Sequence, residues 1–128
     1  MSDGLIRILV VDDNRAMSRV IAFNLARVGY EVITAGNGRE AWEQVQQIPF
    51  DLVITDQQMP EMEGMECCRR LRTLEQHRET PIIMLTAKAL ELDHQRLADE
   101  LGVVAVLMKP FSPIDLVRFV QDCLAPVS

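Results

Sequence analysis

Long apolar runs and a secretory leader are both missing from this sequence of 128 residues. No apolar run reaches the length of about 18 residues that a membrane-spanning helix needs, so we expect no membrane partner. The N-terminus carries no basic stretch ahead of its first apolar run, and carboxylates follow that run directly. We therefore expect no signal peptide and a cytoplasmic location.

Metal-binding cysteine motifs are also missing. The three cysteines, Cys67, Cys68 and Cys123, form no CxxC pair and no Cys/His cluster, which disfavours a zinc site. Adjacent cysteines rarely bridge each other, so we expect buried, reduced thiols. The two histidines, His77 and His94, lie in polar stretches, and we expect both to be solvated.

Positive charge is in deficit, with 13 lysines and arginines against 19 aspartates and glutamates. The net charge of -6 argues against nonspecific binding to nucleic acid or to anionic membranes. Neither GxGxxG nor a P-loop follows the first apolar run, which disfavours a nucleotide-binding fold. We therefore expect no direct nucleic-acid partner.

Short apolar runs alternate with amphipathic stretches along the whole chain. The runs are mostly continuous Val, Ile and Leu, as in strands whose two faces are both covered by helices. We predict strands at Leu5–Val11, Glu31–Ala35, Asp51–Thr55, Pro81–Thr86 and Val103–Met108. Helices are predicted at Arg15–Val28, Gly38–Gln47, Gly64–Glu75, Leu90–Leu101 and Pro113–Leu124. This order predicts one α/β domain over residues 1–128, with a doubly wound parallel sheet.

Polar residues stand where four of these strands end. They are Asp12 with Asp13, Asp56, Thr86 and Lys109. Ligands of open parallel sheets bind at the carboxyl ends of the strands, where the strand order reverses. With a strand order of 2-1-3-4-5, the first and third strands would be neighbours, and the acidic pair would lie beside Asp56.

Converging carboxylates repel one another unless a cation joins them. Hard carboxylate oxygens suit Mg²⁺, which also binds phosphate oxygens. Lys109 would hold a phosphoryl oxygen, Thr86 would donate a hydrogen bond to another, and one carboxylate would be free to attack. Each residue alone has a plainer explanation, such as a turn, a helix cap or a solvated side chain.

The motifs ILVVDDN, DLVITDQQMPEMEG, PIIMLTA and LMKPF occur in this order along nearly the whole chain. With them the sequence resembles the receiver domains of two-component response regulators, which have a flavodoxin-like (βα)5 fold. The resemblance implies that Asp56 is the phosphoacceptor. Asp12 and Asp13, with Asp56 and the backbone carbonyl of Gln58, would bind Mg²⁺ or Mn²⁺. The phosphoryl donor would be a sensor histidine kinase or a phosphotransfer protein.

The same resemblance assigns Thr86 as the switch hydroxyl and Lys109 as the phosphate-binding lysine. It also implies a cis bond between Lys109 and Pro110. The family usually has an aromatic residue three positions before the lysine, and this chain has Val106 there. A β-branched side chain is stiff and has no ring to bury, so we expect a readout through backbone shifts or a weak one.

Two further positions, Gln58 and Lys88, would flank the path of an attacking water in relatives. They could set the lifetime of the acyl phosphate, although both could also be mobile surface side chains. The length resembles that of stand-alone, chemotaxis-type regulators without a DNA-binding output domain. Such proteins present a face made by the fourth helix, fifth strand and fifth helix. Here that face would include Glu91, Asp93, Gln95, Val106, Ile114 and Arg118.

Three interpretations compete at this point. The first is a phosphoryl-accepting signalling domain, whose only enzymatic properties are Mg²⁺-dependent self-phosphorylation and slow self-dephosphorylation, acting as a monomer or as a phosphorylation-dependent dimer. The second is a phosphatase of the haloacid-dehalogenase type, which needs a DxD motif after the first strand, where this chain has Asp12-Asp13. The third is a degenerate receiver that binds partners without phosphorylation. The complete set of polar residues favours the first.

Overall fold

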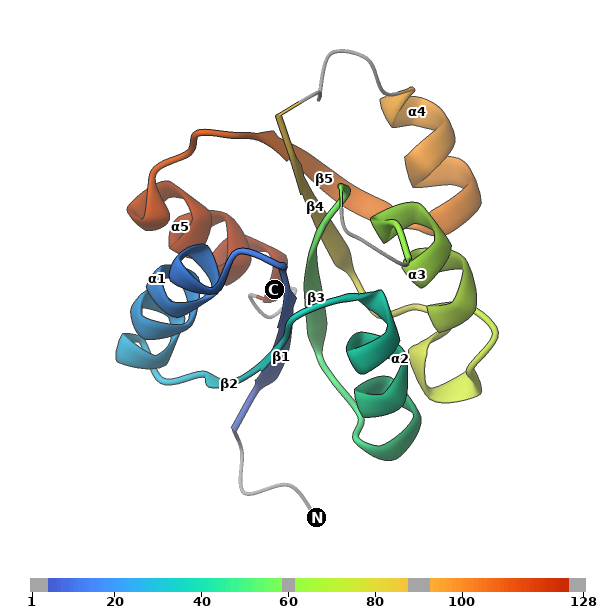
Figure 1. The fold of residues 1–128 in the computed structure, drawn as a ribbon, viewed down its shortest axis with the longest axis horizontal. Helices are drawn as coiled ribbons and strands as arrows, with labels where there is room; N and C mark the ends of the chain where they lie inside the picture. Colours follow the sequence, from blue (N-terminus) through green and yellow to red (C-terminus); the bar gives the residue numbers. More distant parts are fainter. Residues whose placement is uncertain (1–4, 59–61, 88–92, 125–128) are drawn as a thin grey trace.

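The computed structural model describes residues 5–58, 62–87 and 93–124. Five strands alternate with helical segments (Figure 1). The strands are β1 (Arg7–Val11), β2 (Glu31–Ala35), β3 (Leu52–Asp56), β4 (Ile82–Thr86) and β5 (Val103–Met108). The helical segments are α1 (Arg15–Arg27), α2 (Gly38–Gln47), α3 (Gly64–Leu71), the 3-10 turn η1 (Glu75–His77), α4 (His94–Arg96), the π-helical η3 (Leu97–Leu101) and α5 (Pro113–Leu124). Within the described ranges, no helix is long and apolar enough to cross a membrane.

The strands form one parallel sheet in the order β2-β1-β3-β4-β5, which confirms the predicted fold class and topology. The strand order reverses between β1 and β3, where Val11 pairs with Thr55. Every residue of β3 and β4 is buried, because helices cover both faces of the sheet. The residues that follow β1 and end β3 therefore emerge side by side at the carboxyl edge.

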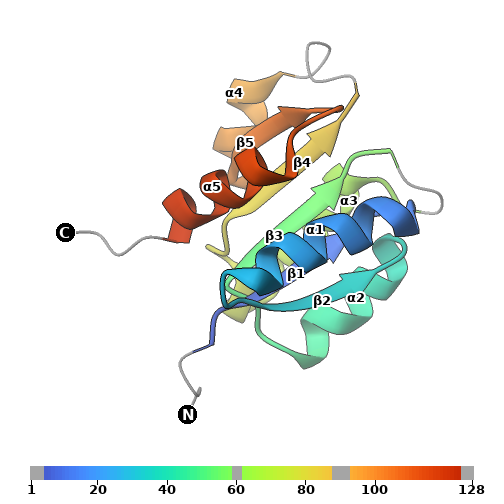
Figure 2. The same cartoon turned by 90° about the vertical axis from the view of Figure 1, so that its left-hand side faces the viewer.

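Helices lie on both faces of the sheet (Figure 2). Between the helices and the sheet are two clusters of buried apolar side chains. Alternate strand residues point to opposite faces, so Leu9 and Val11 pack under α2, α3 and η3. Ile8 and Val10 pack under α1 and α5. Cys67 and Cys68 are buried in the first cluster as predicted, and burial raises the pKa of their thiols to about 11 and about 12.

The predicted boundaries of the third and fourth helices need correction. The prediction for the third helix ran to Glu75, but α3 ends at Leu71, and a separate 3-10 turn follows at Glu75–His77. In the fourth, positions 90–92 lie outside the described residues. The described part begins at His94, where the Asp93 carboxylate accepts a hydrogen bond from the Arg96 backbone N–H at 3.0 Å and caps the helix.

The prediction that His77 is solvated was wrong. Its side chain is fully buried, and its Nε2 accepts a hydrogen bond from the Phe50 backbone N–H at 3.0 Å. Arg72 donates to the carbonyl oxygen of His77 and fixes the turn that buries the imidazole. Burial, with a smaller contribution from Arg72, lowers the pKa of His77 below its usual value. His94 is exposed, as predicted.

Candidate functional site

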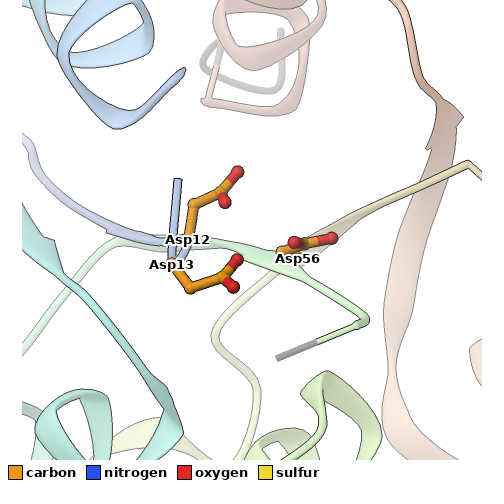
Figure 3. A group of neighbouring side chains, drawn as sticks. All are labelled: Asp12, Asp13 and Asp56. Atoms are coloured by element: carbon orange, nitrogen blue, oxygen red, sulfur yellow. The ribbon is translucent and has the colours of Figure 1, made fainter. Parts of the chain in front are cut away.

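Three carboxylates meet at the carboxyl edge of the sheet. Asp12 and Asp13 follow β1, and Asp56 is the last residue of β3, the neighbouring strand. One oxygen from each of the three lies within 4.8 Å of the others, and the three side chains are neighbours at the ends of β1 and β3 (Figure 3). Asp12 and Asp56 are buried, whereas Asp13 is exposed. The fold thus brings together the acidic residues that the sequence placed at strand ends.

Hydrogen bonds to β2 and to the start of α1 fix the position of Asp12. The backbone N–H of Asp12 donates to the Ala35 carbonyl of β2 at 3.1 Å, and Asp12 Oδ1 accepts a hydrogen bond from the Asn14 N–H at 2.9 Å. Asn14 in turn caps the helix by accepting from the Met17 N–H. The buried Ser18 hydroxyl donates to the carbonyl oxygen of Asp12 at 3.3 Å. Sequence reasoning missed Ser18, because a serine inside an amphipathic helix gives no sign of its partner.

Lys109 reaches into the carboxylate group from the end of β5. Its Nζ lies 3.2 Å from Asp56 Oδ2 and 3.5 Å from Asp12 Oδ2. Its backbone N–H donates to the Thr86 carbonyl oxygen at 2.9 Å, and its bond to Pro110 is cis, as the resemblance implied. One ammonium group therefore pairs with two carboxylates, and with Asp13 beside them the site keeps an excess of negative charge.

Burial and the neighbouring charges together shift the pKa of Asp56. Burial raises the pKa of Asp56, the neighbouring Asp12 carboxylate raises it further, and Lys109 opposes both effects. Asp56 Oδ1 and Asp12 Oδ2 are buried without a hydrogen-bond partner among the described residues. Buried anionic oxygens that accept no hydrogen bond are costly, and a bound cation that they ligate would reduce this cost.

Thr86 completes the group of strand-end residues at the end of β4. Its side chain is fully buried, and its hydroxyl donates to Gln58 Oε1 at 3.0 Å. Gln58 itself is exposed, two positions after Asp56. Lys88, the other predicted modulating residue, lies outside the described residues. Val106 on β5 is partly buried and packs against the apolar cluster beneath α2, α3 and η3.

Gln57 is a structural residue of the site that sequence reasoning missed. It is buried, its Oε1 accepts a hydrogen bond from the Met65 N–H at 3.0 Å, and its carbonyl accepts from the Gly64 N–H. A Cβ atom at Gly64 would lie 2.5 Å from the Asp56 carbonyl oxygen, so only glycine allows α3 to start so close to β3. In the sequence, the only indication of this role is that Gln57 directly follows β3, which begins with an apolar run.

The parallel sheet, the converging carboxylates and the nearby lysine match one known family. A model of the response regulator receiver domain matches residues 8–121. This chain belongs to that family. Its receiver fold serves two-component signal transduction.

Solved and curated relatives agree with this assignment. The receiver is 35% identical to the chemotaxis response regulator CheY4 of Vibrio cholerae, with a TM-score of 0.86, over 94% of this chain and 100% of that one. It is 32% identical to the response regulator TrrA of Thermotoga maritima, with a TM-score of 0.80 over the same shares; that structure is a complex with Mg(2+)-BeF.

A longer relative is the alkaline phosphatase synthesis transcriptional regulatory protein PhoP of Bacillus subtilis (strain 168). The receiver is 43% identical to it over 107 residues, which is 84% of this chain and 43% of PhoP. The chain thus spans less than half the length of this curated relative. The expected lack of an output domain stays a prediction.

Proposed function

We propose that Asp56 accepts a phosphoryl group from a phosphohistidine of a sensor histidine kinase or phosphotransfer protein. The observation that carries this proposal is the pairing of the buried Asp56 carboxylate with Lys109. Oδ2 lies 3.2 Å from the ammonium, while Oδ1 has no hydrogen-bond partner among the described residues. Such an oxygen keeps its lone pairs available for attack, and the ammonium stands ready for the charge that arrives.

In the proposed step, an Asp56 oxygen attacks the phosphorus atom and forms a P–O bond. The P–N bond breaks, and the imidazole leaves with the electron pair and takes up a proton. Lys109 then stabilises a phosphoryl oxygen through its charge, and the Thr86 hydroxyl donates a hydrogen bond to another. Hydrolysis of the mixed anhydride by water would return Asp56 slowly to its starting state.

The residues present fit a divalent cation. Asp12, Asp13 and Asp56 offer hard oxygen ligands within 4.8 Å of one another, and two of the buried oxygens have no hydrogen-bond partner within the described ranges. We propose that these carboxylates and the Gln58 backbone carbonyl hold Mg²⁺, or Mn²⁺ in its place. When bound, the ion neutralises phosphoryl charge. The Mg(2+)-BeF complex of TrrA supports this part of the proposal.

Incubation with acetyl phosphate and Mg²⁺ tests the proposed function. Intact-mass measurement should show one added phosphoryl group in the wild type and none in Asp56→Asn. A matched control is Asp51→Asn, which alters an exposed aspartate before β3 and should keep the increment. A folded wild-type protein that gains no mass would favour the degenerate receiver, and steady turnover of a phosphate monoester would favour a phosphatase.

We propose that phosphorylation alters partner binding through the face formed by α4, β5 and α5. Asp93, Gln95, Ile114 and Arg118 are exposed there, Val106 is partly buried, and Glu91 lies outside the described residues. The free cysteine thiols support a location in the reducing cytoplasm. The downstream partner would be a protein, and sedimentation with and without beryllofluoride would distinguish a monomer from a phosphorylation-dependent dimer.

A further inference from the structure

We infer that Gln58 is a positioning residue that holds the Thr86 hydroxyl away from the phosphoryl site in the unphosphorylated receiver. The inference rests on the proposed function and concerns how that site is regulated. Its basis is the hydrogen bond from Thr86 Oγ1 to Gln58 Oε1, at 3.0 Å. This contact joins a buried side chain at the end of β4 to an exposed one just after β3.

The chemistry of a hydroxyl limits what Thr86 can donate to at one time. A threonine hydroxyl has a single proton, so at any moment it is directed toward one main acceptor. In this structure the amide oxygen of Gln58 is such an acceptor. A phosphoryl oxygen on Asp56 would compete for the same proton, so Thr86 has to leave Gln58 before it can stabilise the phosphoryl group.

The topology places the two competing acceptors at the end of β3 and just after it. β3 and β4 are paired neighbours, with Asp56 opposite Leu85, the residue before Thr86. Asp56 and Gln58 therefore approach the Thr86 hydroxyl from the same neighbouring segment. An anionic phosphoryl oxygen is a stronger acceptor than a neutral amide, so phosphorylation would win the competition. Because the hydrogen bond to Gln58 is lost in the exchange, the net free energy gained from the new hydrogen bond is smaller. The contact therefore stabilises the unphosphorylated position of Thr86.

This role differs from an effect on the attacking water. A residue that positions water alters only the rate at which the acyl phosphate is lost. A residue that holds Thr86 alters the equilibrium between the two positions of the hydroxyl, even when no hydrolysis occurs. Beryllofluoride separates the two roles, because it mimics the phosphoryl group without a bond for water to hydrolyse.

The experiment is a calorimetric titration with beryllofluoride at saturating Mg²⁺, with the Thr86 methyl signal followed by NMR. Gln58→Ala should bind beryllofluoride about three- to fivefold more tightly, because a net hydrogen bond is worth roughly 0.7–1 kcal/mol. Its free Thr86 methyl signal should move toward the bound position. A matched control is Gln47→Ala, an exposed glutamine at the end of α2, which should leave affinity and signal unchanged.

A double-mutant cycle isolates the contact. Thr86→Val removes the hydroxyl, so Gln58→Ala should add no further change in that background. Equal affinities for wild type and Gln58→Ala, with an unchanged Thr86 signal, would overturn the inference and leave the proposed function standing. A wild-type protein that binds no beryllofluoride with Mg²⁺ present would overturn both.

Discussion

Each end of the sheet has a positively charged side chain, Arg72 at the amino end and Lys109 at the carboxyl end, and the two have different kinds of partner. At the amino end, the Arg72 guanidinium donates to the carbonyl oxygens of Leu101, His77 and Gly102 at 2.8, 2.8 and 3.2 Å. At the carboxyl end, the Lys109 ammonium lies between Asp12 and Asp56, and a third carboxylate, that of Asp13, lies nearby. Arg72 provides hydrogen bonds to neutral carbonyl oxygens, whereas the single positive charge of Lys109 does not neutralise the three carboxylates around it.

This difference separates stability from chemistry. Neutral carbonyl oxygens that receive hydrogen bonds hold η1, η3 and β5 together and offer nothing to a ligand. Two buried carboxylate oxygens accept no hydrogen bond from the described residues, which costs stability and leaves them available to a cation or a phosphoryl group. Substitutions at the amino end should therefore weaken the fold, and those that remove charge at the carboxyl end should strengthen it.

The largest effect on stability is expected for Arg72→Met. This variant keeps the apolar stem but removes three hydrogen bonds, which should lower the free energy of unfolding by about 3 kcal/mol. Urea denaturation measures the loss. Arg70→Met is the control: among the described residues it breaks an exposed ion pair with Glu66, and it should cost about 0.5 kcal/mol or less. Equal losses for the two variants would contradict the structural role of Arg72.

A smaller effect concerns pH and His77. The folded pKa of His77 lies below its usual value of 6.5, so the unfolded chain binds the proton first as the pH falls. Stability should therefore fall as the pH drops below 6.5, because the unfolded chain takes up this proton more readily than the folded chain does. His77→Gln should remove this part of the slope, and the exposed His94→Gln should retain it. Parallel pH profiles of stability for wild type and His77→Gln would show that His77 does not cause this loss of stability.

The smallest effect has the opposite sign. Asp12→Asn keeps the acceptor for the Asn14 N–H and removes one of three repelling charges, so it should raise stability by about 0.5 kcal/mol without Mg²⁺. Added Mg²⁺ should stabilise the wild type more than the variant, because binding to the folded state shifts unfolding. Thermal melts with and without Mg²⁺ test both points. If Asp12→Asn were less stable than wild type and responded to Mg²⁺ as wild type does, charge repulsion at the carboxyl end of the sheet would not be the cause.

The fold and the meeting of strand-end residues were predictable from the sequence because both follow from backbone topology. Continuous apolar runs separated by amphipathic stretches admit few arrangements, and a parallel sheet gathers its carboxyl ends at one edge. The polar residues after those runs, such as Asp12 and Asp56, then had to converge. Their chemical roles stay predictions, since topology brings residues together without saying which of them reacts.

Side-chain contacts were not predictable in the same way. His77 lies in the polar stretch EQHRE, and only the turn fixed by Arg72 reveals that its ring is buried. Likewise, the sequence indicated Gln58 as a modulating residue but gave no sign of its contact with Thr86. Such contacts depend on rotamers and loop geometry that carry no periodic signal.

The most direct test of the central claim is to locate the phosphorylated residue. The receiver is incubated with acetyl phosphate and Mg²⁺, reduced with borohydride to convert phosphoaspartate to homoserine, and digested for peptide mass spectrometry. We expect homoserine at position 56 and at neither position 12 nor position 13. Homoserine at Asp12 or Asp13, or a fully unmodified peptide containing Asp56, would contradict the claim that Asp56 carries the chemistry.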